Sequence, residues 1–78
     1  MPLHDTTDQT LARALRQLRR YRGSTQEDLA HSAGITVTAL ARIERGETDP
    51  HWMTVRHVVS ALGISLAELV VAVEDASV

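Results

Sequence analysis

The sequence predicts an all-α fold, a compact bundle of five short helices. Capping residues and glycines divide it into five segments, and each places apolar residues three or four positions apart, as on one face of a helix. Its 78 residues provide for one domain. Phe is absent, so aliphatic side chains must form the core, which suits helices at close range. We expect a domain at residues 9–74, between a mobile N-terminal tail (1–8) and a C-terminal tail (75–78).

The first helix is predicted to begin near Thr6. Thr6 and Gln9 have the spacing of a capping box, in which each side chain binds the backbone N–H of the other residue. The helix ends before Gly23. Its apolar stripe consists of Leu11, Leu15 and Leu18.

The second and third helices are predicted to be short and joined by a tight turn. Thr25 caps the second helix, with Asp28 in the reciprocal position, and Gly34 ends it. Thr36 caps the third helix, which closes at Gly46. Because one residue separates Gly34 from Thr36, the connection must be tight. The expected buried residues are Leu29, Ala30 and Ala33 in the second helix and Leu40 and Ile43 in the third.

The fourth helix follows the loop 47–50 and ends at Gly63, and the fifth is capped by Ser65 with Glu68 as its capping-box partner. The run Leu69–Val73 is apolar all round its helix. It is either an ordinary core helix or one whose outer side pairs with a second copy of the chain. The apolar stripes are Val55, Val58, Val59 and Leu62 in the fourth helix and Leu66, Leu69, Val70 and Val73 in the fifth.

Charge is segregated along the chain although the net charge is only -2. Every basic residue is an arginine, and all eight lie between Arg13 and Arg56, where five acidic residues leave a balance of +3. The flanking segments are anionic. Arginine has a planar guanidinium that binds phosphate and guanine edges through paired hydrogen bonds. A cationic middle segment of this kind is compatible with a nucleic-acid partner.

Several other classes of protein are disfavoured. The absence of Cys excludes disulfides and thiolate zinc sites and suits a cytoplasmic protein. We expect no membrane association, because the longest apolar run is too short to cross a bilayer. The motifs of phosphate loops and nucleophile elbows are absent, so we expect no enzyme activity and no cofactor. His4, His31, His51 and His57 do not have zinc spacing, so we expect no metal.

Residues 26–45 resemble a helix-turn-helix, which places its second helix in the major groove of DNA. Ala30 is the small residue where the two helices cross, and Gly34 provides the positive φ that the turn needs. The wider pattern is similar to the Cro/C1 or XRE family of repressors over roughly residues 9–70. It consists of Leu15-Arg-x-Leu-Arg19, Thr25-Gln26-Glu27-x-Leu29-Ala30, Ile43-Glu44-Arg45-Gly46 and Pro50. The resemblance implies a lambda-repressor-like five-helix domain, usually a homodimer on an inverted repeat.

The base-reading residues are predicted from the third helix. Leu40 and Ile43 define its buried side, so the residues on the opposite side face outward. Arg42 could bind O6 and N7 of guanine, and apolar side chains could touch thymine methyl groups. The alternative for Arg42 is a solvated or phosphate-bound side chain. The predicted base-reading residues are Val37, Thr38, Ala41 and Arg42.

Phosphate contacts are predicted at the beginning of the second helix and in the loop after the third. Gln26 is the strongest candidate, because the free N–H groups at the start of a helix favour anions. Trp52 could donate its indole N–H to a phosphate, lie in a dimer interface or pack in the core. The predicted set is Gln26, Arg45, Thr48 and Trp52.

Arg19 and Glu44 are predicted to form a structural ion pair. Arg19 flanks the apolar stripe of the first helix, and in the family that the chain resembles its counterpart pairs with the acid at the position of Glu44. The remaining arginines of this helix are expected to form a solvated face. These are Arg13, Arg16 and Arg20.

The sequence therefore predicts a dimeric, sequence-specific DNA-binding regulator, most simply a repressor that occupies a promoter on double-stranded DNA. The main alternative is an antitoxin or adaptor whose C-terminal apolar face binds another protein, with DNA binding secondary. A controller of a restriction-modification operon is a third form of the DNA-binding interpretation. The predicted dimer interface consists of Leu66, Leu69, Val70, Val71 and Val73.

Overall fold

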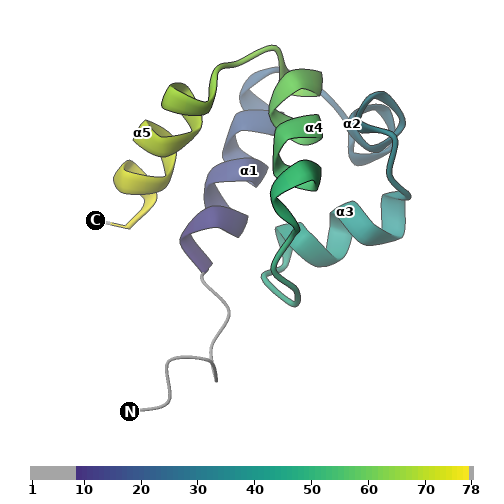
Figure 1. Ribbon diagram of the computed structural model, residues 1–78, viewed down its shortest axis with the longest axis horizontal. Coiled ribbons are helices and arrows are strands. Elements are labelled where there is room, and N and C mark those ends of the chain that lie inside the picture. Colours follow the sequence, from purple (N-terminus) through teal and green to yellow (C-terminus); the bar gives the residue numbers. More distant parts are fainter. Residues whose placement is uncertain (1–8, 78) are drawn as a thin grey trace.

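The computed structural model describes residues 9–77, which form five helices and no strand. The helices are α1 (Gln9–Tyr21), α2 (Gln26–Ala33), α3 (Val37–Glu44), α4 (Trp52–Leu62) and α5 (Leu66–Ala76). The predicted five-helix fold is thus confirmed over this range. In Figure 1, α1 and α4 lie in the middle of the molecule, with α5 on one side and α2 and α3 on the other. α2 packs against both α3 and α4, while α5 packs mainly against α1.

The predicted helix starts are confirmed at three caps. The Thr25 hydroxyl oxygen accepts a hydrogen bond from the Asp28 backbone N–H at 3.0 Å, and that of Thr36 accepts one from the Ala39 N–H at 3.0 Å. Ser65 and Glu68 form the complete capping box, with both hydrogen bonds at 3.0 Å. Each cap satisfies an N–H group that has no partner inside its helix. The predicted start of the first helix near Thr6 lies outside the described residues, as does the segment 1–8.

The turn between α2 and α3 depends on Gly34. Its φ is +74°, in the left-handed region that residues with a Cβ rarely adopt. The backbone N–H of the following residue, Ile35, donates to the carbonyl oxygen of Ala30 at 3.0 Å and closes the turn. This geometry brings α3 across α2 with only three residues between the two helices, as in a helix-turn-helix.

A single core joins all five helices. It includes Leu15 of α1 and Leu40 of α3, both almost completely buried. Ala30 is 2% exposed, which confirms that a small residue lies where α2 packs against its neighbours. The buried cluster consists of Leu15, Leu29, Ala30, Ala33, Leu40, Ile43, Val58, Val59, Leu62 and Leu69. Short helices of this kind depend on such packing, because isolated helices of about ten residues are marginal in water.

The structure changes two expectations for the last helix. α5 runs to Ala76, two residues past the predicted domain end at 74, and Ala76 is buried. The carbonyl oxygen of Ala76 accepts a hydrogen bond from Arg13 Nη1 at 2.9 Å. Leu69, predicted at a dimer interface, instead belongs to the core of a single copy, and Val73 is half-buried against that core. Leu69 therefore has almost no surface to offer a partner.

Among residues 9–77, no single helix is long and apolar enough to cross a membrane. α4 and α5 together meet that test of length and composition, but they are separated by a bend of 99°. Both helices place side chains in the core, including Val58 and Leu69.

Candidate nucleic-acid interface

The outer side of α3 is a solvent-facing surface, as predicted. Leu40 and Ile43 are buried, so the side chains opposite them point away from the core. We call Val37, Thr38, Ala41 and Arg42 the reading face; Ala41 is half-buried and the other three are exposed. The Arg42 side chain is 56% exposed and can reach beyond the helix. A helix that enters a major groove needs an outer side left open to solvent in this way, and contact of the reading face with bases stays a prediction.

The predicted ion pair between Arg19 and Glu44 is present and mostly buried. Arg19 Nε donates to Glu44 Oε2 at 2.7 Å, and Arg19 Nη2 donates to Glu44 Oε1 at 2.9 Å. The exposed fractions of the two side chains are 12% and 1%. These hydrogen bonds raise the pKa of Arg19 above its ordinary value. Because α1 carries Arg19 and α3 ends at Glu44, the pair fixes the end of α3 against α1.

Gln26 belongs to the same buried network. Its Nε2 donates to Glu44 Oε1 at 3.0 Å, so the carboxylate receives hydrogen bonds from α1 and α2 together. An amide nitrogen carries two hydrogens, and this bond uses one of them. The other is available to a phosphate, because Gln26 is half-buried at the first position of α2. Glu44 thus fixes the direction of the side chain that we predicted as the strongest phosphate contact.

The loop after α3 contains a carboxylate that sequence reasoning did not single out. Arg45 Nε donates to Glu47 Oε2 at 2.6 Å, and Arg45 Nη2 donates to Glu47 Oε1 at 3.2 Å. Arg42 Nε lies 3.9 Å from Glu47 Oε1. The hydrogen bond from Arg45 is the main reason that the pKa of Glu47 lies below its ordinary value of 4.5. The only sequence signal for the cluster of Arg42, Arg45 and Glu47 was the position of Glu47, two residues after Arg45 and five after Arg42.

The other predicted phosphate-contacting residues lie near the ends of α3 and α4. Arg45 is exposed and Thr48 is half-buried in the loop between these helices. Trp52, the first residue of α4, is 61% exposed, which excludes the alternative that it packs in the core. Contact of the indole with a phosphate or with a second copy stays a prediction.

Two arginines of α1 differ from the predicted solvated face. Arg16 Nη1 donates to the carbonyl oxygen of Glu44 at 2.7 Å, and Arg13 donates to the end of α5. Both therefore bind C-terminal carbonyl oxygens of other helices, where the partial negative charge favours a cation. Arg20 is exposed, as expected.

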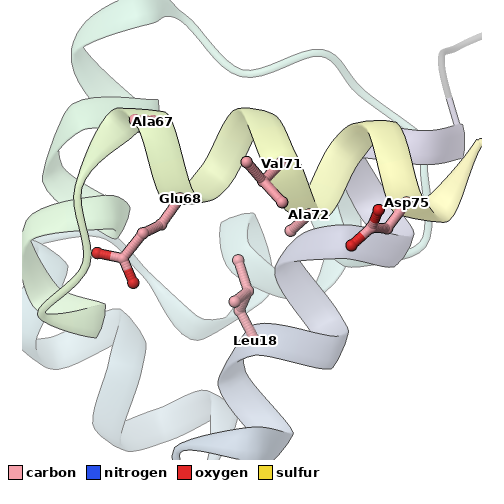
Figure 2. A pocket seen from close by; sticks show the side chains of 6 residues that line it. All are labelled: Leu18, Ala67, Glu68, Val71, Ala72 and Asp75. Carbon is pink, nitrogen blue, oxygen red and sulfur yellow. The ribbon is translucent and has the colours of Figure 1, made fainter.

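A second exposed surface lies on α5. Val70 and Val71 are each more than half exposed, and Leu66 is also exposed. Beside them a shallow groove runs between α1 and α5, and Figure 2 shows Leu18 of α1 pointing toward α5 across its floor. Glu68 and Asp75 place carboxylates along this groove. The predicted dimer interface therefore has three exposed apolar members, Leu66, Val70 and Val71.

The described residues offer little for a metal ion. His31 and His57 line one shallow hollow at the end of α2. No three His, Cys, Asp or Glu side chains are grouped to hold a metal anywhere in residues 9–77.

Comparison with known proteins decides the family. The helix-turn-helix domain family matches residues 10–71, which include all of α2 and α3 and most of the rest of the described chain. The chain belongs to this family. Its matched range includes the complete reading face and the residues around Glu44. The resemblance inferred from the sequence motifs is therefore confirmed.

Relatives of this helix-turn-helix protein are named as regulators. The HTH-type transcriptional regulator DdrOP3 of Deinococcus deserti is 39% identical over 64 residues, which cover 82% of this chain and 50% of the relative. The chain thus spans about half the length of that protein. The uncharacterized HTH-type transcriptional regulator YazB of Bacillus subtilis is 39% identical over 57 residues, covering 73% of this chain and 83% of the relative.

A solved structure shares the arrangement of helices over the whole chain. The clp gene regulator ClgR from Corynebacterium glutamicum superimposes with a TM-score of 0.85 at 27% identity, covering 100% of this chain and 97% of that chain. The order and packing of the five helices are therefore those of a solved gene regulator.

Proposed function

We propose that this helix-turn-helix protein is a sequence-specific, DNA-binding transcriptional regulator that acts as a homodimer on an inverted repeat. The observation that carries the proposal is the geometry of α3. The tight turn at Gly34 sets α3 across α2, the core holds its inner side, and the reading face is left in solvent. Relatives that are named as transcriptional regulators support the same role. In this proposal the protein binds promoter DNA in the cytoplasm. Repression is the simplest outcome, because a protein that occupies a promoter blocks its use.

In this proposal α3 enters the major groove and its side chains read base edges. Arg42 binds O6 and N7 of a guanine, Thr38 donates or accepts a hydrogen bond, and Val37 and Ala41 contact thymine methyl groups. Gln26, Arg45, Thr48 and Trp52 contact phosphates on either side of the groove. Three of the four reading-face side chains are small, so one base pair per half-site, the one under Arg42, dominates the specificity.

The dimer is proposed to form through α5. Leu66, Val70 and Val71 expose an apolar strip on a helix whose opposite side is already in the core. A two-fold interface through this strip buries the same residues on both copies. The two reading faces then address half-sites about 34 Å apart, one turn of B-DNA.

The experiment that tests the proposal is selection of bound duplexes from a random DNA pool at two salt concentrations. Arg42→Ala is selected in parallel, and Arg20→Ala is the matched control because it removes the same charge from an exposed position on α1. We expect an enriched inverted repeat in which Arg42→Ala loses preference at one base pair per half-site, whereas Arg20→Ala keeps it. Salt-sensitive binding without any enriched sequence would contradict sequence-specific recognition.

A protein-interaction module is the second candidate function, and the surface of α5 favours it. The apolar strip lies beside a groove bearing Glu68 and Asp75, which suits a partner segment with both apolar and basic residues. In that case an antitoxin or adaptor role uses α5 for a different protein, and DNA binding is secondary. Purification of the untagged complex from the native host discriminates, because a regulator that forms homodimers elutes without a stoichiometric second chain.

A further inference from the structure

Glu47 is the charged residue at the reading face that the proposed function leaves unused. Its carboxylate accepts two hydrogen bonds from Arg45, at 2.6 and 3.2 Å, and lies 3.9 Å from Arg42 Nε. One acid thus binds the arginine proposed to contact a phosphate and lies close to the arginine proposed to read a base. The net charge of the three side chains is +1 instead of the +2 that the two arginines carry alone.

This arrangement forces a competition when DNA approaches. A phosphate that binds the Nε and Nη2 edge of Arg45 displaces Glu47, and one that binds the remaining N–H groups is still repelled by the nearby carboxylate. The side chains of Arg45 and Glu47 are 56% and 49% exposed, so the pairing is weak enough to open. The penalty that the carboxylate imposes is larger for a phosphate, which carries a negative charge, than for the neutral edge of a base.

The gain on opening differs between DNA sequences. Random DNA offers only phosphates to Arg42 and Arg45. The Glu47 carboxylate beside the arginines makes the binding of these phosphates less favourable. A recognised sequence also presents a guanine edge to Arg42, and such a bidentate contact discriminates against the wrong base by roughly tenfold to a hundredfold. At the recognised sequence Arg42 therefore contacts a neutral group that Glu47 repels little, whereas at random DNA Glu47 opposes a phosphate at both arginines.

We propose that Glu47 is a specificity-determining residue, which competes with phosphates for Arg42 and Arg45 and so weakens binding to random DNA more than binding to the recognised sequence. The inference rests on the DNA-binding function proposed above. In this inference Glu47 lowers the affinity for random DNA, and Arg42 raises the affinity for the recognised sequence.

The test compares Glu47→Gln with Asp49→Asn. Asp49 is an exposed acid in the same loop, and no ion pair joins it to an arginine within residues 9–77. Both variants remove one negative charge near α3, but only Glu47→Gln frees the two arginines. Affinities are measured by fluorescence anisotropy for the selected inverted repeat and for a scrambled duplex, over a range of salt concentrations. Thermal melting of each variant checks that the fold is retained.

We expect Glu47→Gln to raise the affinity for the scrambled duplex by about fivefold per bound copy, and that for the selected repeat by about twofold or less. For the scrambled duplex, the slope of log affinity against log salt should steepen by about one for each additional phosphate contact. Asp49→Asn should change both affinities by similar small factors. The ratio of the two affinities therefore falls in Glu47→Gln alone.

Two results overturn the inference. If Glu47→Gln and Asp49→Asn change both affinities alike while the wild-type protein still selects a sequence, Glu47 acts only through its charge and the proposed function stands. If neither the wild-type protein nor Glu47→Gln binds any duplex at low salt, the inference and the proposed function both fail.

Discussion

Replacement of Glu44 by Ala tests the buried network that holds α1, α2 and α3 together. Glu44 is 1% exposed and accepts three hydrogen bonds, two from Arg19 and one from Gln26. The Ala variant leaves the Arg19 guanidinium, which is 12% exposed, without its counter-charge. Removal of one partner of a buried pair costs about 3–5 kcal/mol, and the partial exposure of Arg19 puts this case near the lower end.

A loss of about 3 kcal/mol is large for a chain of this size, whose total stability should be about 4–12 kcal/mol. It corresponds to a fall in melting temperature of roughly 12–24 °C. The measurement is urea unfolding followed by far-UV circular dichroism, together with a thermal melt. Glu44→Gln is the matched control, since it keeps the size and one acceptor oxygen of the side chain, and we expect it to lose about half as much free energy.

A double-mutant cycle that includes Arg19→Met separates the energy of the ion pair from that of side-chain packing. If the charges are coupled, the double variant Arg19→Met/Glu44→Met should lose less free energy than the sum of the single variants Arg19→Met and Glu44→Met, because neither charge is then stranded. A free energy of unfolding for Glu44→Ala within about 1 kcal/mol of the wild-type value would refute the argument, because that is the scale of an exposed ion pair.

Three further predictions follow from other parts of the chain. Gly34→Ala should cost about 1–2 kcal/mol of stability from backbone conformation alone, because a Cβ there meets no atom within 4 Å. Gly46→Ala should cost a similar amount, because its Cβ would meet only the end of the exposed Gln9 side chain, which can move aside; urea unfolding compares the two. The pKa of the Glu47 carboxyl, measured by NMR, should lie below 4.5, and in Arg45→Ala it should return toward 4.5. The ion pairs of Glu47 are therefore complete above pH 4.5 and are lost as the pH falls through the lowered pKa. Val70→Glu should give monomers in sedimentation and much weaker operator binding, and a dimer at unchanged affinity would contradict the α5 interface.

The elements of the fold could be predicted because local chemistry determines them. Thr25, Thr36 and Ser65 cap helices wherever the chain around them is helical, since their hydroxyl groups reach an N–H only three residues away. Gly34 ends α2 because the backbone there has a positive φ. The ion pair of Arg19 and Glu44 joins residues far apart in the sequence, and it was predicted from the family resemblance instead.

The contacts that could not be predicted are those of long side chains between distant segments. Arg13 donates to a carbonyl oxygen 63 positions later in the chain, and Arg16 donates to one 28 positions later. Neither bond leaves a trace in hydrophobic periodicity, because a guanidinium on a flexible stem can reach any acceptor that the tertiary fold brings near it. The burial of Ala76 depends on the same packing of α5 against α1, and the expected domain end at residue 74 did not include it.

The electrostatic character of the reading face likewise depends on where the acids lie and not on the sum of charges. A balance of +3 between residues 9 and 56 suggests a strongly cationic middle segment. In the folded chain, Glu44 neutralises Arg19 inside the protein, and Glu47 is shared by Arg42 and Arg45 on the surface. The arginines closest to the proposed groove contact are therefore partly neutralised before DNA arrives. A protein built this way must obtain its affinity from the correct base edge and from a second copy, because a general attraction to phosphate contributes less than its arginine count implies.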